Sequence, residues 1–141
     1  MAAVDIYTIM YCPYCADAKE LLRSKGVDFH EIDVSGNREV RKQMIERAHM
    51  HGIKVIGATL TPYVGAVYAT DRGETLREGL NNWIRTSKAY DAVIDFEAAV
   101  QDPANPKQIR PSFNIRDHLH PNDDGYKAMA AAVDLALFKS K

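Results

Sequence analysis

The fold is decided by the stretch IYTIMYCPYC at residues 6–15 and by ADAKELLRSK, which follows it at residues 16–25. Residues 6–9 are β-branched or aromatic, as is typical of a strand. Ala18, Leu21 and Leu22 then fall on one face of a helix over residues 15–25, and Gly26 is suited to end it. The sequence therefore predicts a strand, a turn carrying two cysteines, and a helix.

The same alternation of strand and helix continues along the chain. Asn37 and Asn122 each stand where a helix cap is expected, and Thr70 or Asp71 begins the helix between them. Two prolines, Pro103 and Pro106, open an irregular stretch over residues 102–121. Strands are expected at residues 27–34, 53–56 and 92–96, and helices at residues 37–48, 70–87 and 122–137. Strict alternation predicts an α/β protein whose strands are parallel.

Size and charge limit the classes of function. The 141 residues fit a single domain, and 18 basic against 19 acidic side chains leave a net charge of −1. With no basic surface field, we expect no nucleic-acid partner and no anionic membrane partner. The chain has no apolar run long enough for a membrane span and no signal peptide at its start, so we expect a cytoplasmic location.

The two cysteines, Cys12 and Cys15, are three positions apart. They are too few for a structural zinc site, and they lie too close together in the sequence for a disulfide between them to link distant parts of the fold. We therefore expect no metal and no cofactor, and a chemical role for the pair. At the start of a helix, unpaired amides stabilise the thiolate of Cys12, and Cys15 lies one turn further on to resolve a mixed disulfide.

Residues 4–48 resemble the opening of a glutaredoxin, with the motif Tyr11-Cys12-Pro13-Tyr14-Cys15 directly after the first strand. The resemblance implies thiol–disulfide oxidoreductase activity through Cys12 and Cys15. It stops before the Thr-Val-Pro strand and the Gly-Gly-Asp turn that grip glutathione in that family. We therefore expect little affinity for glutathione.

Residues 51–138 resemble the C-terminal portion of SGNH (GDSL-type) hydrolases. The resemblance rests on residues 53–62, on residues 93–96 and on the run from Asp117 to Tyr126. It implies that His120 is a catalytic base oriented by Asp117. The nucleophilic Gly-Asp-Ser block of the family is absent, so serine hydrolysis is not expected. The serines stand in other contexts: Ser24, Ser35, Ser87, Ser112 and Ser140.

The two resemblances meet near residues 46–51, in a helix that fits either parent. They predict a glutaredoxin-derived segment at residues 1–48 and a hydrolase-derived segment at residues 49–141, folded as one domain over residues 1–141. The expected architecture has three layers, flavodoxin-like or Rossmann-like. Its four parallel strands, numbered along the chain, lie in the order 2-1-3-4 with helices on both faces. Because half a domain cannot bury its own core, the leading interpretation is an engineered chimera, built to test recombination of fold fragments and without an evolved function.

Two enzymatic alternatives accompany that interpretation. The first is residual thiol–disulfide exchange through Cys12 and Cys15. The second is a weak cysteine-dependent esterase, in which Cys12 takes the place of the missing serine and meets His120 and Asp117. We expect no obligate partner, and either a monomer or a weak dimer formed through an edge strand.

Overall fold

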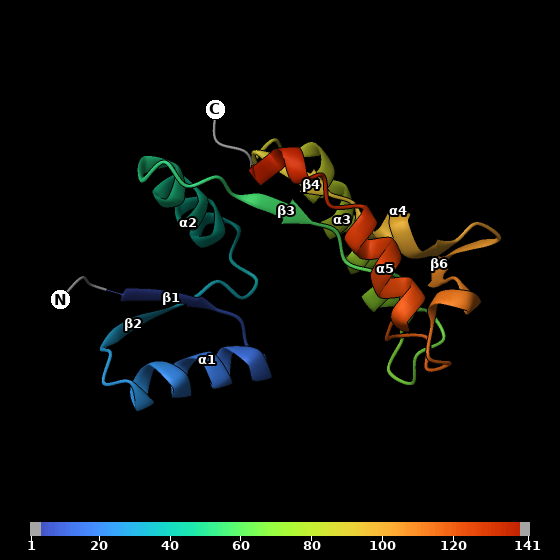
Figure 1. Ribbon diagram of the computed structural model, residues 1–141, viewed down its shortest axis with the longest axis horizontal. Helices are drawn as coiled ribbons and strands as arrows, with labels where there is room; N and C mark the ends of the chain where they lie inside the picture. The colour runs from blue at the N-terminus through green and yellow to red at the C-terminus, as the bar shows by residue number, and fades with distance from the viewer. Residues whose placement is uncertain (1–3, 139–141) are drawn as a thin grey trace. The chain divides into compact units, whose positions relative to one another are not determined.

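The computed structural model describes residues 4–138, without the side chains of Pro13 and Tyr14. The chain consists of two compact units that divide between Ile53 and Lys54 (Figure 1). Each unit contains both helices and strands, which confirms the α/β class. The expectation of a single domain over residues 1–141 stays a prediction. One cooperative transition, seen alike in Trp83 fluorescence and in far-UV circular dichroism, would support it.

The first unit has two strands and two helices in strict alternation. Its strands, β1 (Val4–Thr8) and β2 (Phe29–Asp33), pair in parallel with Thr8 opposite Asp33, as the sequence predicts. The helix α1 (Pro13–Ser24) joins them, and α2 (Arg38–Met50) follows β2. Figure 1 shows α1 and α2 on opposite sides of the sheet. The carboxyl ends of β1 and β2 therefore open together beside the start of α1.

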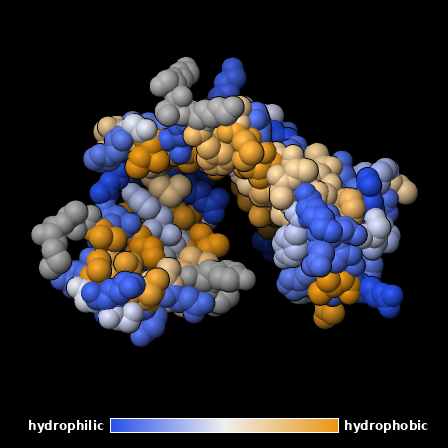
Figure 2. All heavy atoms as spheres, viewed as in Figure 1, coloured by the Kyte–Doolittle hydropathy of each residue, from blue (hydrophilic) through white to orange (hydrophobic). Residues whose placement is uncertain are grey.

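Caps and a small apolar core hold the first unit. The Asn37 side chain accepts hydrogen bonds from the amides of Glu39 and Val40, which confirms it as the cap of α2. Val34 and Ile45 are its buried apolar side chains among the described residues. Apolar residues are also visible among polar ones on the surface of this unit (Figure 2). The buried apolar core of this unit is therefore small among the described residues.

The second unit begins with β3 (Ile56–Ala58), which pairs in parallel with β4 (Ala92–Ile94). Between them lies α3 (Asp71–Thr86), capped by Thr70. After β4 come a short helix, an antiparallel hairpin, a 3-10 turn and a last helix that leads into a second 3-10 turn. These elements are α4 (Phe96–Val100), β5 (Gln101–Asp102), β6 (Asn105–Ile109), η1 (Pro111–Phe113), α5 (Asp123–Ala131) and η2 (Leu135–Phe138).

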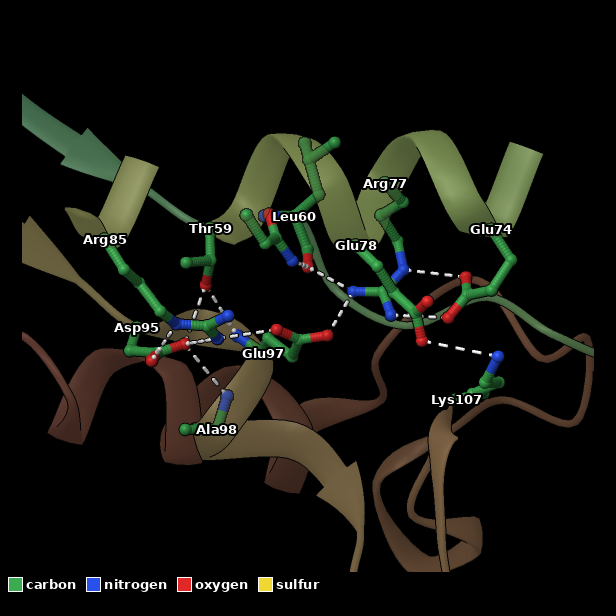
Figure 3. A network of polar contacts seen from close by, with 11 residues as sticks. Thr59, Leu60, Glu74, Arg77, Glu78, Arg85, Asp95, Glu97, Ala98 and Lys107 are labelled. Atoms are coloured by element: carbon green, nitrogen blue, oxygen red, sulfur yellow. Dashed lines mark hydrogen bonds and ion pairs between the residues drawn. The ribbon is translucent and has the colours of Figure 1, made fainter. Parts of the chain in front are cut away.

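A network of charges, buried around Arg77 and partly exposed around Arg85, joins α3 to the segment after β4 (Figure 3). The Arg77 guanidinium donates to Glu74 at 2.8 and 2.6 Å, to Glu97 and to the carbonyl of Leu60. Arg85 donates to Asp95 at 2.8 and 2.7 Å and to Glu97 at 2.5 Å. Because each carboxylate has a cationic partner, charges that burial would penalise become links between elements.

The pKa values in this network follow from those contacts. Burial raises the pKa of Glu97, but hydrogen bonds from Arg77 and Arg85 outweigh it, and the net pKa lies below the ordinary value. The pKa of Asp95 is also lowered, chiefly by its hydrogen bonds from Arg85. Both carboxyls are therefore ionised at neutral pH.

The expected four-stranded sheet in the order 2-1-3-4 is wrong. The structure contains two parallel pairs, β1 with β2 and β3 with β4, and a separate antiparallel pair, β5 with β6. The two parallel pairings themselves agree with the prediction. Every strand offers the same backbone donors and acceptors, so a pattern of alternation specifies strands but does not specify which distant strands pair.

The segment at residues 102–121 is more regular than the irregular stretch that its prolines predict. Pro106 lies within β6, in a two-stranded hairpin where the backbone N–H that proline lacks costs little. The last helix is shorter than expected, since α5 ends at Ala131 although Asn122 caps it as predicted. Tyr126 in this helix is exposed.

Candidate functional site

The Cys12–Cys15 pair lies at the start of α1 as a disulfide, with 5.3 Å between the two Cα atoms. Cys12 has the extended backbone of a cap residue, and its Sγ accepts a hydrogen bond of 3.1 Å from the Cys15 amide. A helix N-terminus stabilises negative charge through such unpaired amides. The geometry therefore places Cys12, of the two sulfurs, where a thiolate is favoured in the reduced protein.

A pocket of about 640 Å³ opens beside this disulfide, within the first unit. Thr8 at the end of β1 and Glu31 and Asp33 in β2 form part of its lining. The loop from Ile9 to Cys12 and the first turns of α1, including Lys19, form the rest of the lining. Met10 and Tyr11 in that loop are 64% and 98% exposed, and Cys12 and Cys15 are half-buried.

Hydrogen bonds fix the polar part of the pocket. Glu31 Oε1 accepts from Lys19 Nζ at 2.7 Å and from the Thr8 hydroxyl at 2.9 Å. These two bonds, that from Lys19 first, hold the pKa of Glu31 below its ordinary value. Bonds from Ser35 likewise lower the pKa of Asp33. The Ser35 hydroxyl also accepts from the Met10 amide at 2.6 Å, which ties the cysteine loop to the end of β2.

The second predicted pair, Asp117 and His120, lies together in the loop before α5. His120 Nδ1 is 2.5 Å from Asp117 Oδ2. Asp117 Oδ1 accepts from the amides of Leu119 and His120, both at 2.9 Å. The His120 contact and these amide bonds lower the pKa of Asp117 strongly. The carboxylate thus orients the imidazole and leaves Nε2 as the nitrogen available to a substrate.

Asn114 positions that loop, although nothing in the sequence singles it out. Its buried side chain accepts from the amides of Arg116 and His118 at 2.6 and 3.0 Å, and it donates to the His120 carbonyl at 3.2 Å. Arg116 and His118 both have left-handed backbones, with φ of 78° and 59°. An asparagine in a loop is common, so only the folded loop before α5 reveals this role.

The four predicted site residues thus form two pairs. Cys12 and Cys15 belong to the first unit, whereas Asp117 and His120 belong to the second. The meeting of Cys12 with His120 and Asp117 stays a prediction. Lys19, Glu31 and Asp33 are pocket residues that sequence reasoning missed, since charges on a strand or helix are ordinarily surface charges.

Within residues 4–138, no group of three or more His, Cys, Asp or Glu side chains is placed to hold a metal ion. No helix in the same range combines the length and apolar character that crossing a bilayer requires.

The first unit thus carries a Cys12–Cys15 disulfide at a helix start beside a pair of parallel strands, and known protein families match this part of the chain and the part that follows it. The glutaredoxin family model matches residues 4–56, and the model of GDSL-like lipases and acylhydrolases matches residues 31–133. The chain therefore belongs to the glutaredoxin family over its N-terminal part and to the GDSL-like lipase/acylhydrolase family over residues 31–133. The two matches overlap in residues 31–56, which contain the α2 helix that the sequence assigns to either parent.

Three relatives illustrate the first match. Glutaredoxin 3 of Escherichia coli (strain K12) is 54% identical over 48 residues, which are 34% of this chain and 58% of the relative. A glutaredoxin of Pseudomonas aeruginosa is 42% identical over 64 residues, 45% of this chain and 67% of the relative. An uncharacterized glutaredoxin-like protein of Clostridium pasteurianum is 34% identical over 53 residues, 38% of this chain and 71% of the relative.

The chain spans little more than half the length of the Escherichia coli relatives that it matches. A composite of a glutaredoxin segment and a hydrolase segment accounts for both family matches, as the sequence predicts. That the join is engineered and that the chain has no evolved function stay predictions.

Proposed function

We propose that this protein is a thiol–disulfide oxidoreductase, with Cys12 as the attacking thiol and Cys15 as the resolving thiol. The observation that carries the proposal is the position of Cys12 Sγ at the N-terminus of α1. This sulfur forms the disulfide with Cys15 and accepts a hydrogen bond from the Cys15 amide. The match to glutaredoxins over residues 4–56 supports the same activity.

The reaction follows from this arrangement. The Cys12 thiolate attacks one sulfur of a substrate disulfide, and the other sulfur leaves as a thiolate that takes a proton from water. The Cys15 thiolate then attacks Cys12 Sγ and releases the second substrate thiol. Two electrons pass from the protein to the substrate, and the Cys12–Cys15 disulfide remains. A small dithiol reductant returns the protein to its starting state.

The first test is the rate at which Cys12 is alkylated as a function of pH in a Cys15→Ser variant. A helix N-terminus lowers a thiol pKa from about 8.5 into the range of about 3.5 to 7.5, so alkylation should stay fast below pH 7. The matched variant Cys12→Ser leaves Cys15 inside the helix, and its alkylation should be slower at the same pH. A Cys12 thiol that titrates near 8.5 would contradict the proposal.

Turnover separates the two cysteines. With a mixed disulfide as substrate, Cys12→Ser should abolish reduction, because no thiol remains at the helix start. Cys15→Ser should still form the mixed disulfide with Cys12 but should not release it without added thiol. Mass spectrometry of the trapped adduct distinguishes these results. An adduct on Cys15 in place of Cys12 would reverse the assigned roles.

A second candidate function, weak ester hydrolysis, is favoured by the Asp117–His120 pair. Asp117 holds Nδ1 of His120, so Nε2 can accept a proton from a nucleophile. Hydrolysis of an activated ester such as 4-nitrophenyl acetate tests it. His120→Ala should lower the rate, whereas His51→Ala, which removes an exposed imidazole at the end of α2, should not.

The nucleophile in that reaction can be identified in the same assay. A nucleophile that is acylated quickly gives an initial burst of 4-nitrophenol. Loss of this burst in Cys12→Ser would support the cysteine-dependent esterase that the sequence predicts. A rate that depends on His120 but is unchanged in Cys12→Ser would indicate that His120 activates water instead. Equal rates in the His120→Ala and His51→Ala variants would exclude a role for the pair.

A further inference from the structure

The pocket beside the disulfide has an uneven charge. Among its lining residues that the structure describes, the charged ones are Lys19, Glu31 and Asp33, one cation and two anions. The others are polar without charge or apolar, including Ile9 and Met10. A substrate that approaches the sulfurs therefore meets more negative than positive charge.

The one cation of this lining is already engaged. Lys19 Nζ lies 2.7 Å from Glu31 Oε1, and the two charges largely cancel. An anionic substrate would have to separate this ion pair to gain the lysine. The pocket thus offers a substrate carboxylate no uncommitted cation among its described lining residues.

Asp33 supplies the remaining charge. It ends β2, directly opposite Thr8 in the register, and its Oδ1 accepts the Ser35 amide at 2.7 Å. This bond fixes the carboxylate at the pocket rim, and Ser35 in turn holds the Met10 amide of the cysteine loop. The charge that faces an incoming disulfide is therefore both ordered and tied to the loop that carries Cys12.

We propose that the Cys12 site selects disulfides flanked by cationic groups, such as those of basic peptides, over disulfides flanked by carboxylates, and that Asp33 sets this preference. The inference rests on the proposed thiol–disulfide exchange and names its substrate class. The chemistry is unchanged: Cys12 bonds to one substrate sulfur, the other leaves as a thiol, and Cys15 completes the two-electron transfer.

The test compares three small disulfides with the fully reduced protein: cystamine, which is cationic, 2-hydroxyethyl disulfide, which is neutral, and oxidised glutathione, which carries more carboxylates than ammonium groups. Each second-order rate constant is divided by that of uncharged dithiothreitol with the same disulfide, which removes differences in intrinsic reactivity. At low salt we expect the normalised rate of cystamine to exceed that of oxidised glutathione by about tenfold, with the neutral disulfide between them. Near 1 M salt, where the Debye length is about 3 Å, the three should converge.

Two variants that each change the charge of the pocket lining by one unit test which residue sets the preference. Asp33→Asn keeps an oxygen for the Ser35 amide but removes the charge, and it should reduce the preference for cystamine about threefold. Lys19→Gln leaves Glu31 uncompensated and should raise the preference. The matched control is Asp28→Asn, the same change just before β2, at the opposite end of the strand from the pocket. It should leave the preference unchanged.

The outcomes separate the two proposals. If none of the three disulfides reacts faster with the unmodified protein than with the Cys12→Ser variant, the proposed oxidoreductase function fails. If the disulfides react but oxidised glutathione is preferred, or if Asp28→Asn acts as strongly as Asp33→Asn, exchange stands and the charge selection is overturned. Opposite shifts for Asp33→Asn and Lys19→Gln would establish it.

Discussion

The two units use ion pairs in opposite ways. In the second unit the side chains of Arg77 and Glu74 are each 4% exposed, whereas those of Lys19 and Glu31 in the first unit are 23% and 39% exposed. Water screens the exposed pair and replaces its partners when one is removed, but it cannot reach the buried pair. The buried network therefore links elements of the second unit, and the exposed pair contributes to the charge of the pocket beside the disulfide.

Apolar residues are also more deeply buried in the second unit than in the first. Val100 and Ile109 are almost completely buried beside the charged network of the second unit. In the first unit the loop before Cys12 carries Met10 and Tyr11 into solvent. The loop that leads to the disulfide is therefore more exposed than the apolar core of the second unit.

The largest expected effect comes from breaking the buried network. Arg77→Ala leaves Glu74 and Glu97 buried without one of their cations, which should cost about 3–5 kcal/mol in the free energy of unfolding of the second unit. Urea unfolding followed by the fluorescence of Trp83, the single tryptophan, measures it. Arg72→Ala, an exposed change on the same helix, is the control. A loss of less than about 1 kcal/mol would mean that the network is not structural.

A smaller effect is expected at Gly125, which packs against both ends of the loop that carries the Asp117–His120 pair. A Cβ there would lie 2.5 Å from the Phe113 carbonyl oxygen and 2.8 Å from Pro121 Cβ. Gly125→Ala should destabilise the second unit by about 1–3 kcal/mol and displace the loop.

Gly79→Ala is the matched control for Gly125. Gly79 lies in α3 with open space around it, so alanine there should stabilise the helix by about 0.5–1 kcal/mol. The same Trp83 signal reports both variants. Equal effects of the two substitutions would show that crowding at Gly125 is not the cause.

Acid should weaken the second unit. The pKa of Glu97 in the folded state is below its ordinary value of 4.5, and that of Asp95 is below 3.8. A depressed pKa stabilises the folded state above the unfolded value, and this stability is lost as pH falls through the folded value. The Trp83 transition should therefore be constant above about pH 5 and shift to lower urea below about pH 4.5.

Arg85→Gln checks the origin of that acid sensitivity, since Arg85 is the first cause of the lowered pKa of Asp95. The variant should be less stable at pH 7 and should lose less further stability on acidification. An unchanged pH dependence would place the sensitivity at other carboxyls.

The smallest effect is expected for the exposed pair. Lys19→Gln should leave the unfolding of the first unit, followed by far-UV circular dichroism, within experimental error, because solvent replaces the lost partner. The same variant should nevertheless alter the choice of disulfide, as proposed above. A large loss of stability would remove the contrast between the two units.

Much of the local structure follows from short-range sequence signals. Asn37, Thr70 and Asn122 cap helices as predicted, and Cys12 precedes α1 with Cys15 one turn on. Asp117 and His120 contact each other, as the resemblance to SGNH hydrolases implies. Each of these features depends on residues within about one helical turn, where backbone geometry alone brings the side chains together.

The amino-acid sequence by itself determined the α/β class, the positions of the dithiol and of the Asp117–His120 pair, and the two family segments. Only the tertiary structure decided that β1 and β3 belong to separate sheets, that Glu31 engages Lys19, and that Arg77 is buried between carboxylates. Strand pairing and buried charge both depend on residues far apart in the chain. Their free energy comes from which partners exclude water from one another, and a local pattern does not contain that information.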